Sequence, residues 1–449
     1  MQLRIFLGAL WWAFTCLAAC QKKRSIHASR LATESAPQDP RSKVVAPKVF
    51  IITMFPPEAD PWLKNSGNPN GIGSLLDMNI TIPGASPLFP QAHCLASGTV
   101  CLMTIGEGEI NAASTMTALL LSHLFDLTKT YFLITGIAGV NPNHGTLSDV
   151  AFAKYAVQIG LQYEFDAREV PGDWRTGYVP LGAKHPDLYP TSLYGTEVFE
   201  LNANLRDAAY DFAVGAAMND SGISVDYRQN YNTATAGSAS RFKAALRTPG
   251  VIKGDVVTSD VYFSGTLLGE SIEKFVTLIT NGSAVYTMTA QEDNATLNSL
   301  LRAAMLDLVD FSRVIIMRGA ADFDRPYPGS SCLDNLFGIK QGAFDPSIRN
   351  LYTSGMMVVR GILGEWEGRY ERGVEAKNYI GDLWGNLGGK PDFGPGRQHS
   401  DNPVQERGLD GDTDSETRNH SILEWVGYKS LVRGLAFNTL SLGMVLILN

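Results

Sequence analysis

Short apolar runs that alternate with helical patterns constrain the fold of this chain more than any other feature. The runs have the length of buried strands, and they lie at residues 49–54, 100–105, 131–135, 149–157 and 314–317. Between them, residues 111–125 and 297–309 repeat apolar side chains at helical spacing. The alternation predicts an α/β fold, a three-layer sandwich in which helices cover both faces of a central mixed sheet.

The first of these helices has a clear apolar face. Asn111 is a suitable N-cap, and the residues that share the face are Met116, Leu119, Leu120 and Leu124. In sheets covered by helices in this way, ligands bind beyond the carboxyl ends of the strands. We therefore look for a functional site in the turns that follow the apolar runs.

Composition limits the kind of partner. The 449 residues are 45% hydrophobic and 18% charged, which is enough apolar material for one large core. The formal net charge is −8, whereas proteins that bind a phosphate backbone need clustered Lys and Arg. We expect no nucleic acid polymer as a partner.

The two ends of the chain differ from the region between them. Arg4 and the apolar stretch 5–19 are typical of a signal peptide over residues 1–20, which predicts a secreted or cell-surface protein. A flexible leader, 21–45, then precedes one domain at 46–392. The tail 393–449 is expected to be disordered. Its apolar end, 435–448, is open to three interpretations: a lipid-anchor signal, a weak anchor or a divergent tail.

Sequons and cysteines fit an exported protein. Acceptor sequons for N-glycosylation lie at Asn79, Asn219, Asn281, Asn294 and Asn419. Cys94 and Cys101 flank a turn, so they form either a disulfide across a hairpin or two buried thiols, and Cys332 is left over. Because the histidines and the remaining cysteines show no ligand spacing, we expect no metal and no organic cofactor.

Three segments carry residues suited to binding or chemistry. The first is a Gly-rich turn at 104–113 with Gly106 and Gly108, which are either simple turn residues or part of a cradle for an oxygen-rich ligand. The second is 134–139, where Gly139 at a strand end lets the backbone approach a sugar. The third is 318–322, where Asp322 is either a general acid or a salt-bridged residue.

Taken together and in this order, the segments resemble the purine nucleoside phosphorylase and nucleosidase superfamily. The phrases YEFDARE at 163–169, DWRTGYVPLG at 173–182 and TAQEDNA at 289–295 resemble in particular the fungal family of purine nucleoside permeases. The likeness covers about residues 47–392 and implies a nucleoside phosphorylase-like fold.

The resemblance also implies roles for single residues. Glu58 stands where the bacterial nucleosidases carry a water-activating glutamate, and its alternative is a solvated loop carboxylate. Tyr262 or Phe263 would stack on the purine ring, with a core aromatic as the alternative. Glu292 would bind the ribose hydroxyls, and Asp293 is its rival one residue later.

The segment RGAAD at 318–322 is similar to the Arg-x-x-x-Asp of the superfamily, in which the Asp protonates N7 of the leaving purine. It matches at Arg318 and Asp322, but Ala321 stands where many relatives carry Ser. The phosphorylases bind phosphate with an Arg where this chain has Ile134, and an aliphatic side chain cannot pair with phosphate. Hydrolysis is therefore favoured over phosphorolysis, unless Arg168 or Arg175 substitutes.

The expected function is binding of a purine nucleoside and cleavage of its N-glycosidic bond, with water or phosphate as co-substrate. The alternative is a component of nucleoside uptake that binds the nucleoside without turnover and delivers it to a separate membrane carrier. A homo-oligomer is also left open.

Overall fold

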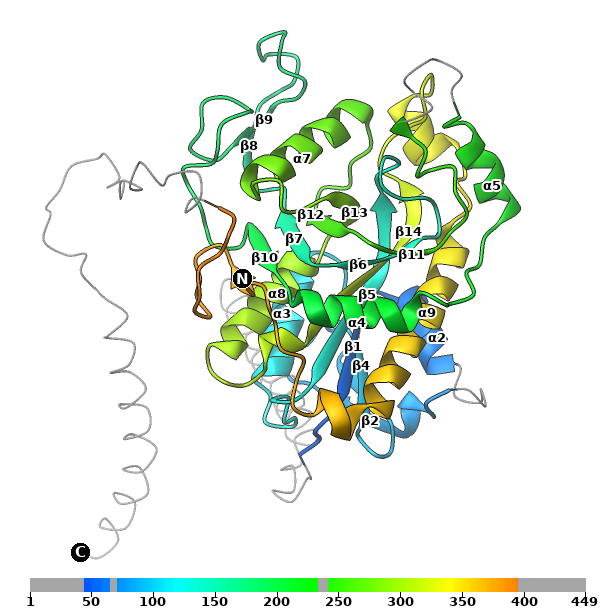
Figure 1. Ribbon diagram of the computed structural model, residues 1–449, viewed down its shortest axis with the longest axis vertical. Coiled ribbons are helices and arrows are strands. Elements are labelled where there is room, and N and C mark those ends of the chain that lie inside the picture. The colour runs from blue at the N-terminus through cyan, green and yellow to red at the C-terminus, as the bar shows by residue number, and fades with distance from the viewer. Residues whose placement is uncertain (1–43, 65–70, 233–240, 395–449) are drawn as a thin grey trace, which may run out of the picture. The chain divides into compact units, whose positions relative to one another are not determined.

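The computed structural model describes residues 44–64, 71–232 and 241–394 (Figure 1). All of them belong to the first of the two units into which the chain divides, residues 1–398. The expected signal peptide, nearly all of the leader, the tail from residue 395 and the sequon at Asn419 lie outside the described residues.

Thirteen strands of the described residues form one mixed sheet. Its main path runs in the order β15-β10-β7-β12-β13-β5-β1-β4-β3-β2. Beside this path, β14 pairs with β5 and β6, and β6 pairs with β11. The bounds are β1 Val49–Thr53, β2 Met78–Thr81, β3 Gln91–Cys94, β4 Val100–Thr104, β5 Tyr131–Val140, β6 Val150–Ala153, β7 Tyr155–Gln158, β10 Val198–Glu200, β11 Val251–Lys253, β12 Asp255–Thr258, β13 Tyr286–Ala290, β14 Val314–Phe323 and β15 Gly381–Asp382.

Strands β4, β1, β5 and β14 lie parallel to one another. Their carboxyl ends therefore meet at one edge of the sheet. A separate hairpin of β8 (Gln162–Glu164) and β9 (Tyr178–Pro180) projects from one end of the molecule (Figure 1).

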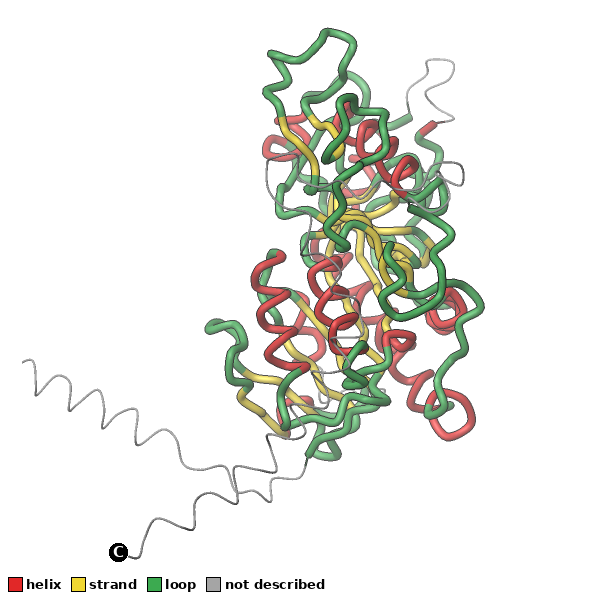
Figure 2. Tube along the Cα trace, turned by 90° about the vertical axis from the view of Figure 1, so that its left-hand side faces the viewer, coloured by secondary structure: helices red, strands yellow, loops and turns green. Residues whose placement is uncertain are grey.

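Helices cover both faces of the sheet, as Figure 2 shows. In β1, Phe50 and Ile52 belong to one core cluster and Val49 and Ile51 to the other, because successive side chains of a strand point to opposite faces. The first cluster includes side chains of α3 (Glu109–Leu120) and α8 (Asp293–Ala304), and the second those of α2 (Pro56–Lys64), α4 (Ala203–Ala213) and α9 (Phe344–Gly364). The expected three-layer mixed α/β fold is confirmed. The other α-helices within the described residues are α5 (Gly222–Gln229) and α7 (Thr266–Ile279).

Two of the expected strands extend beyond their apolar runs, and a third run is divided between two strands. β5 and β14 continue past Thr135 and Met317 because they pair with each other as far as Val140 and Phe323. The segment 134–139 is therefore part of a strand and not a turn at its end. The run 149–157 divides into β6 and β7, where Asp255 Oδ1 accepts from the backbone N–H groups of Lys154 and Tyr155 (3.0 and 2.9 Å).

The expected helices begin earlier than their patterns. α3 starts at Glu109 with Gly108 as its N-cap, so the prediction of Asn111 as the cap was wrong. Asn111 instead donates its side-chain amide to the carbonyl of Glu107 (2.8 Å). α8 starts at Asp293 and ends at Ala304, before the expected end at residue 309.

Cys94 and Cys101 face each other in the antiparallel pair β3–β4 and form a disulfide. Cys332 is exposed and unpaired among the described residues. Of the sequons, Asn294 is 2% exposed and donates its amide to the carbonyl of Thr196 (2.7 Å), so it cannot carry a glycan in this fold. Within the described ranges, no helix is both long enough and apolar enough to cross a membrane.

The contact between α8 and the sheet should be important for stability. Leu300 on α8 is fully buried in the first core cluster, so Leu300→Ala should lower the free energy of unfolding by about 2–5 kcal/mol. Arg302→Ala, at an exposed position of the same helix, should change it by less than about 0.5 kcal/mol. Urea denaturation of both variants measures the difference, and equal losses would contradict this packing.

Candidate functional site

A cavity of about 790 Å³ opens at the carboxyl ends of β1, β5, β12 and β14. It is lined by residues within β5 and β14, by residues that follow β1 and β12, by the end of β13, and by segments at the starts of α5 and α9. Of the residues singled out in the sequence, it brings together Glu58, Gly139, Tyr262, Phe263, Glu292, Arg318 and Asp322. These positions are spread over more than 260 residues of the chain, so only the fold makes them neighbours.

Glu58 lies in the first turn of α2 and is 5% exposed. Its Oε2 accepts from the backbone N–H of Met54 (2.8 Å), and its Oε1 accepts from that of Ile137 (2.7 Å). Burial raises the pKa of Glu58 to about 8, against the opposing effects of nearby Arg318 and of the two hydrogen bonds. Glu58 is therefore a buried carboxyl at the cavity and not a solvated loop residue.

Arg318 is 1% exposed, and its guanidinium forms a bidentate pair with Asp293. The distances are 3.1 Å from Nε to Oδ2 and 2.5 Å from Nη2 to Oδ1. Glu292 Oε2 lies 3.4 Å from the same Nη2. A buried guanidinium with two carboxylates is held by charge as well as by hydrogen bonds.

The structure separates the two rival acids. Asp293 is fully buried against Arg318 and does not line the cavity, whereas Glu292 does. Glu292 Oε1 accepts from the backbone N–H of Gly108 (3.0 Å). Glu292 is therefore the acid available to a ligand.

Asp322 lies near the end of β14, where the pairing with β5 is irregular. Ala320 pairs with Ala138 and Asp322 with Gly139, so Ala321 is an extra residue in this strand. A bulge of this kind changes the direction in which the following side chain points. Here Asp322 and Ala321 both line the cavity.

The surroundings of Asp322 make its carboxylate easier to protonate than that of an ordinary aspartate. Burial raises its pKa to about 6; a hydrogen bond from the Tyr262 hydroxyl to Oδ2 lowers it, and the charge of Asp324 raises it further. Gly139 lies against the other oxygen, because a Cβ atom there would be 3.0 Å from Oδ1. The role expected for Gly139, close approach of the backbone to a sugar, stays a prediction; the side chains that lie nearest to it are those of Thr289 and Asp322.

The other candidate residues divide between the cavity lining and positions outside it. Gly106 and Gly108 do not line the cavity; both have positive φ (90° and 85°) and shape the turn before α3. Arg168 pairs with Asp166 and Arg175 with Glu270, and neither lines the cavity. Tyr262 and Phe263 do line it, and Tyr262 is 61% exposed, so it is not a core aromatic.

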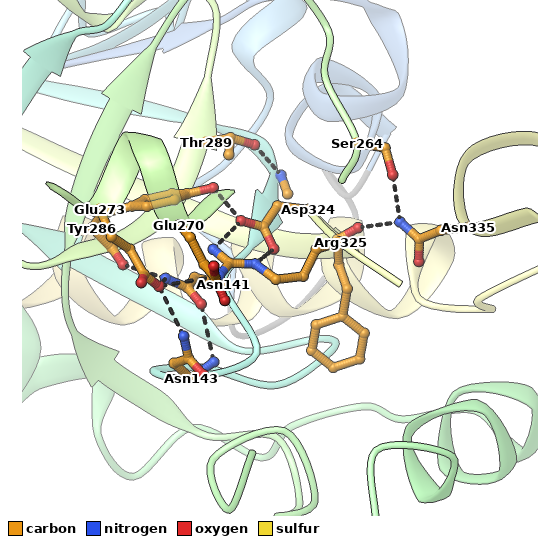
Figure 3. Close-up of polar contacts among 12 residues, drawn as sticks. Asn141, Asn143, Ser264, Glu270, Glu273, Tyr286, Thr289, Asp324, Arg325 and Asn335 are labelled. Atoms are coloured by element: carbon orange, nitrogen blue, oxygen red, sulfur yellow. Dashed lines mark hydrogen bonds and ion pairs between the residues drawn. The ribbon is translucent and has the colours of Figure 1, made fainter. Parts of the chain in front are cut away.

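Sequence reasoning missed a buried network around Asp324 and Arg325 (Figure 3). Arg325 is fully buried and pairs with Asp324, which also accepts from the hydroxyl of Tyr286. Glu273 of α7 accepts hydrogen bonds from Arg325 and from Asn141. The spacing of Asp322 and Asp324 could have indicated this network, because side chains two residues apart in a strand point to the same face.

No group of three or more His, Cys, Asp or Glu side chains within the described residues could hold a metal ion.

A substitution at Gly136 of β5 tests how closely Glu58 and Arg318 are packed. A Cβ atom at this residue would lie 2.6 Å from Arg318 Nη1 and 2.7 Å from Glu58 Oε1. Gly136→Ala should therefore displace both side chains and lower the free energy of unfolding by about 1–3 kcal/mol. Gly215→Ala, where a Cβ atom meets nothing within 4 Å, is the control. Equal thermal stability of the two variants would contradict the close packing at Gly136.

Comparison with known proteins places this chain in a family. A family model described as purine nucleoside permease (NUP) matches residues 46–375. The chain is 45% identical over 359 residues to a purine nucleoside permease of Candida albicans, covering 78% of this chain and 84% of that protein. It is 37% identical over 334 residues to a probable purine nucleoside permease of Schizosaccharomyces pombe, covering 73% of this chain and 92% of that protein.

The similarity to solved structures is weaker. A 5′-methylthioadenosine/S-adenosylhomocysteine nucleosidase from Neisseria meningitidis aligns with a TM-score of 0.41 and 14% identity, over 70% of this chain and 99% of the nucleosidase. Futalosine hydrolase of Helicobacter pylori aligns with a TM-score of 0.40 and 12% identity, over 72% of this chain and 98% of the hydrolase. Scores this low support no transfer of function. The family model and the fungal relatives show that this chain belongs to the purine nucleoside permease family.

Proposed function

We propose that this protein binds a purine nucleoside in the 790 Å³ cavity and hydrolyses its N-glycosidic bond. One observation carries the proposal: two desolvated carboxyl groups, Glu58 and Asp322, line the same cavity, and Glu292 lines it as well. The ligand class agrees with the names of the fungal relatives.

Hydrolysis of such a bond needs a general acid, a general base and groups that bind the sugar. The bond between C1′ and N9 breaks with its electrons moving to the purine, and the sugar becomes cation-like in the transition state. Asp322 donates a proton to N7 of the leaving base. Glu58 takes a proton from the water whose oxygen bonds to C1′, and Glu292 accepts hydrogen bonds from the ribose hydroxyls.

The charge of the cavity favours water over phosphate as the second reactant. Its lining has more acidic than basic side chains, and its one buried cation, Arg318, already pairs with Asp293 and Glu292. A phosphate dianion would be repelled by this field. The acidic lining residues are Glu58, Glu107, Asp220, Glu292, Asp322, Asp324 and Asp345, and the basic ones are Arg318, Lys340 and Arg349.

A second function is favoured by the family itself, whose members are called permeases. In this alternative the protein binds a nucleoside in the same cavity and releases it intact for uptake by a separate membrane carrier. The two functions share the ligand and differ in whether the glycosidic bond breaks.

Chromatography distinguishes them. The purified protein is incubated with adenosine, guanosine, inosine or uridine, each with and without phosphate. Hydrolysis predicts free base and ribose from the purine nucleosides in the absence of phosphate. Recovery of intact nucleoside together with saturable binding would favour the uptake function, and strict dependence on phosphate would indicate a phosphorylase.

Asp322→Asn should separate cleavage from binding. Because the amide cannot donate the proton that a carboxylic acid does, cleavage should fall about 10²–10⁴-fold, while the affinity for nucleoside changes little. Asp211→Asn, which alters an exposed acid on α4 outside the cavity lining, is the control. Single-turnover assays give the rate, and an unchanged rate would remove Asp322 from the mechanism.

The pH profile follows from the two pKa values. Activity needs Asp322 protonated, and that fraction falls tenfold per pH unit above about pH 6; it also needs Glu58 ionised, and that fraction falls tenfold per pH unit below about pH 8. Between these two pH values the changes offset each other. Both conditions are met in only about 1% of molecules at pH 7. The value of kcat/KM should be level between about pH 6 and 8 and fall tenfold per pH unit on each side. A profile that rises steadily from pH 5 to 9 would contradict these roles.

A further inference from the structure

The loop between β12 and α7, residues 259–265, places a tyrosine hydroxyl on the proposed acid. Tyr262 donates its hydroxyl to Asp322 Oδ2. Among the described residues, this is the one hydrogen-bond partner of the Asp322 carboxyl. The contact joins two segments sixty residues apart in the sequence.

Hydrogen bonds hold the backbone of this loop at both ends, whereas the Tyr262 ring is attached to the rest of the site through its hydroxyl. Ser259 donates its N–H to the carbonyl of Ala290 (3.1 Å), and Gly265 donates to the carbonyl of Asp324 (3.1 Å). The Tyr262 side chain is 61% exposed, and its neighbour Val261 is 57% exposed. The ring can therefore rotate away from Asp322 without movement of the loop.

The hydroxyl and a purine compete for the same group. A hydroxyl that donates to a carboxylate stabilises its ionised form, and that form cannot donate a proton. In the proposed complex N7 approaches Oδ2, because the other oxygen, Oδ1, lies against Gly139 of β5. The Tyr262 hydroxyl takes the hydrogen-bonding position on Oδ2 that N7 would use.

We propose that Tyr262 is a displaceable cap on Asp322: its hydroxyl occupies the acid in the empty cavity, and a bound purine base displaces it. The inference rests on the proposed binding of a purine nucleoside, and it adds a step that stacking of the Tyr262 ring alone does not require. Tyr262 is then a residue that sets affinity, because each binding event replaces its hydrogen bond.

A binding experiment that involves no turnover tests the cap. The probe is 9-deazainosine, whose sugar is joined by a C–C bond that hydrolysis does not cleave and whose N7–H donates to a carboxylate. Isothermal titration calorimetry gives its affinity for the full protein and for Tyr262→Phe, which keeps the ring and removes the hydroxyl. Loss of the competing hydrogen bond should tighten binding about fivefold.

Two controls make the result specific. Tyr194→Phe removes the hydroxyl of a tyrosine that is equally exposed (62%) and outside the cavity lining, and it should leave affinity unchanged. In a double-mutant cycle with Asp322→Ala, Tyr262→Phe should no longer tighten binding, because the hydroxyl has lost its acceptor. Circular dichroism of each variant shows that it is folded.

The outcomes separate the cap from the proposed hydrolysis. Equal or weaker binding by Tyr262→Phe overturns the cap, whether or not nucleosides are cleaved. Fivefold tighter binding that disappears in the Asp322→Ala background supports the cap, even if chromatography finds no free base and hydrolysis fails. Absence of binding to both the natural protein and Tyr262→Phe overturns the cap and the nucleoside site together.

Discussion

The buried guanidinium of Arg318 is the interaction on which the floor of the cavity depends. It extends from the middle of β14, pairs with Asp293 at the start of α8, and lies close to Glu292 and to Glu58 of α2. One cation thus pairs with two neighbouring acids at the start of α8 and lies beside a third, Glu58 of α2. Removal of one partner of such a buried pair leaves an uncompensated charge, which typically costs about 3–5 kcal/mol. Stability and the arrangement of the cavity lining are therefore coupled at this residue.

The two proposed reacting acids are placed by different means. Glu58 is fixed by two backbone N–H groups, and these hydrogen bonds leave its position little freedom. Asp322 is turned toward the cavity by the extra residue Ala321 in β14, and its partner is an exposed tyrosine side chain. Glu58 is thus held rigidly, whereas Asp322 has a partner that can be exchanged. This arrangement suits the proposed site, in which the purine of an entering ligand replaces the hydrogen bond from Tyr262.

Part of the fold could be predicted, because the five apolar runs start at, or one residue before, the starts of β1, β4, β5, β6 and β14. Their ends could not. Residues 136–140 are rich in Gly and Ala, which have low strand propensity, yet β5 continues through them because β14 supplies a partner along its whole length. In the same way α3 is capped by Gly108 and not by Asn111, since the turn conformation at Gly108 already ends the preceding segment.

The sequence by itself determined the layer architecture, the family resemblance and four candidate acids, Glu58, Glu292, Asp293 and Asp322, but not Asp324, which also lines the cavity. The tertiary structure decided which of them face the cavity: Glu292 and not Asp293, Asp322 by way of a bulge, and Glu58 in a buried position. The physical reason is that a shift of one residue turns a side chain to another face. Groups distant in the chain fix these positions. Arg318 holds Asp293, the pairing of β14 with β5 places the bulge before Asp322, and the backbone N–H of Ile137 holds Glu58.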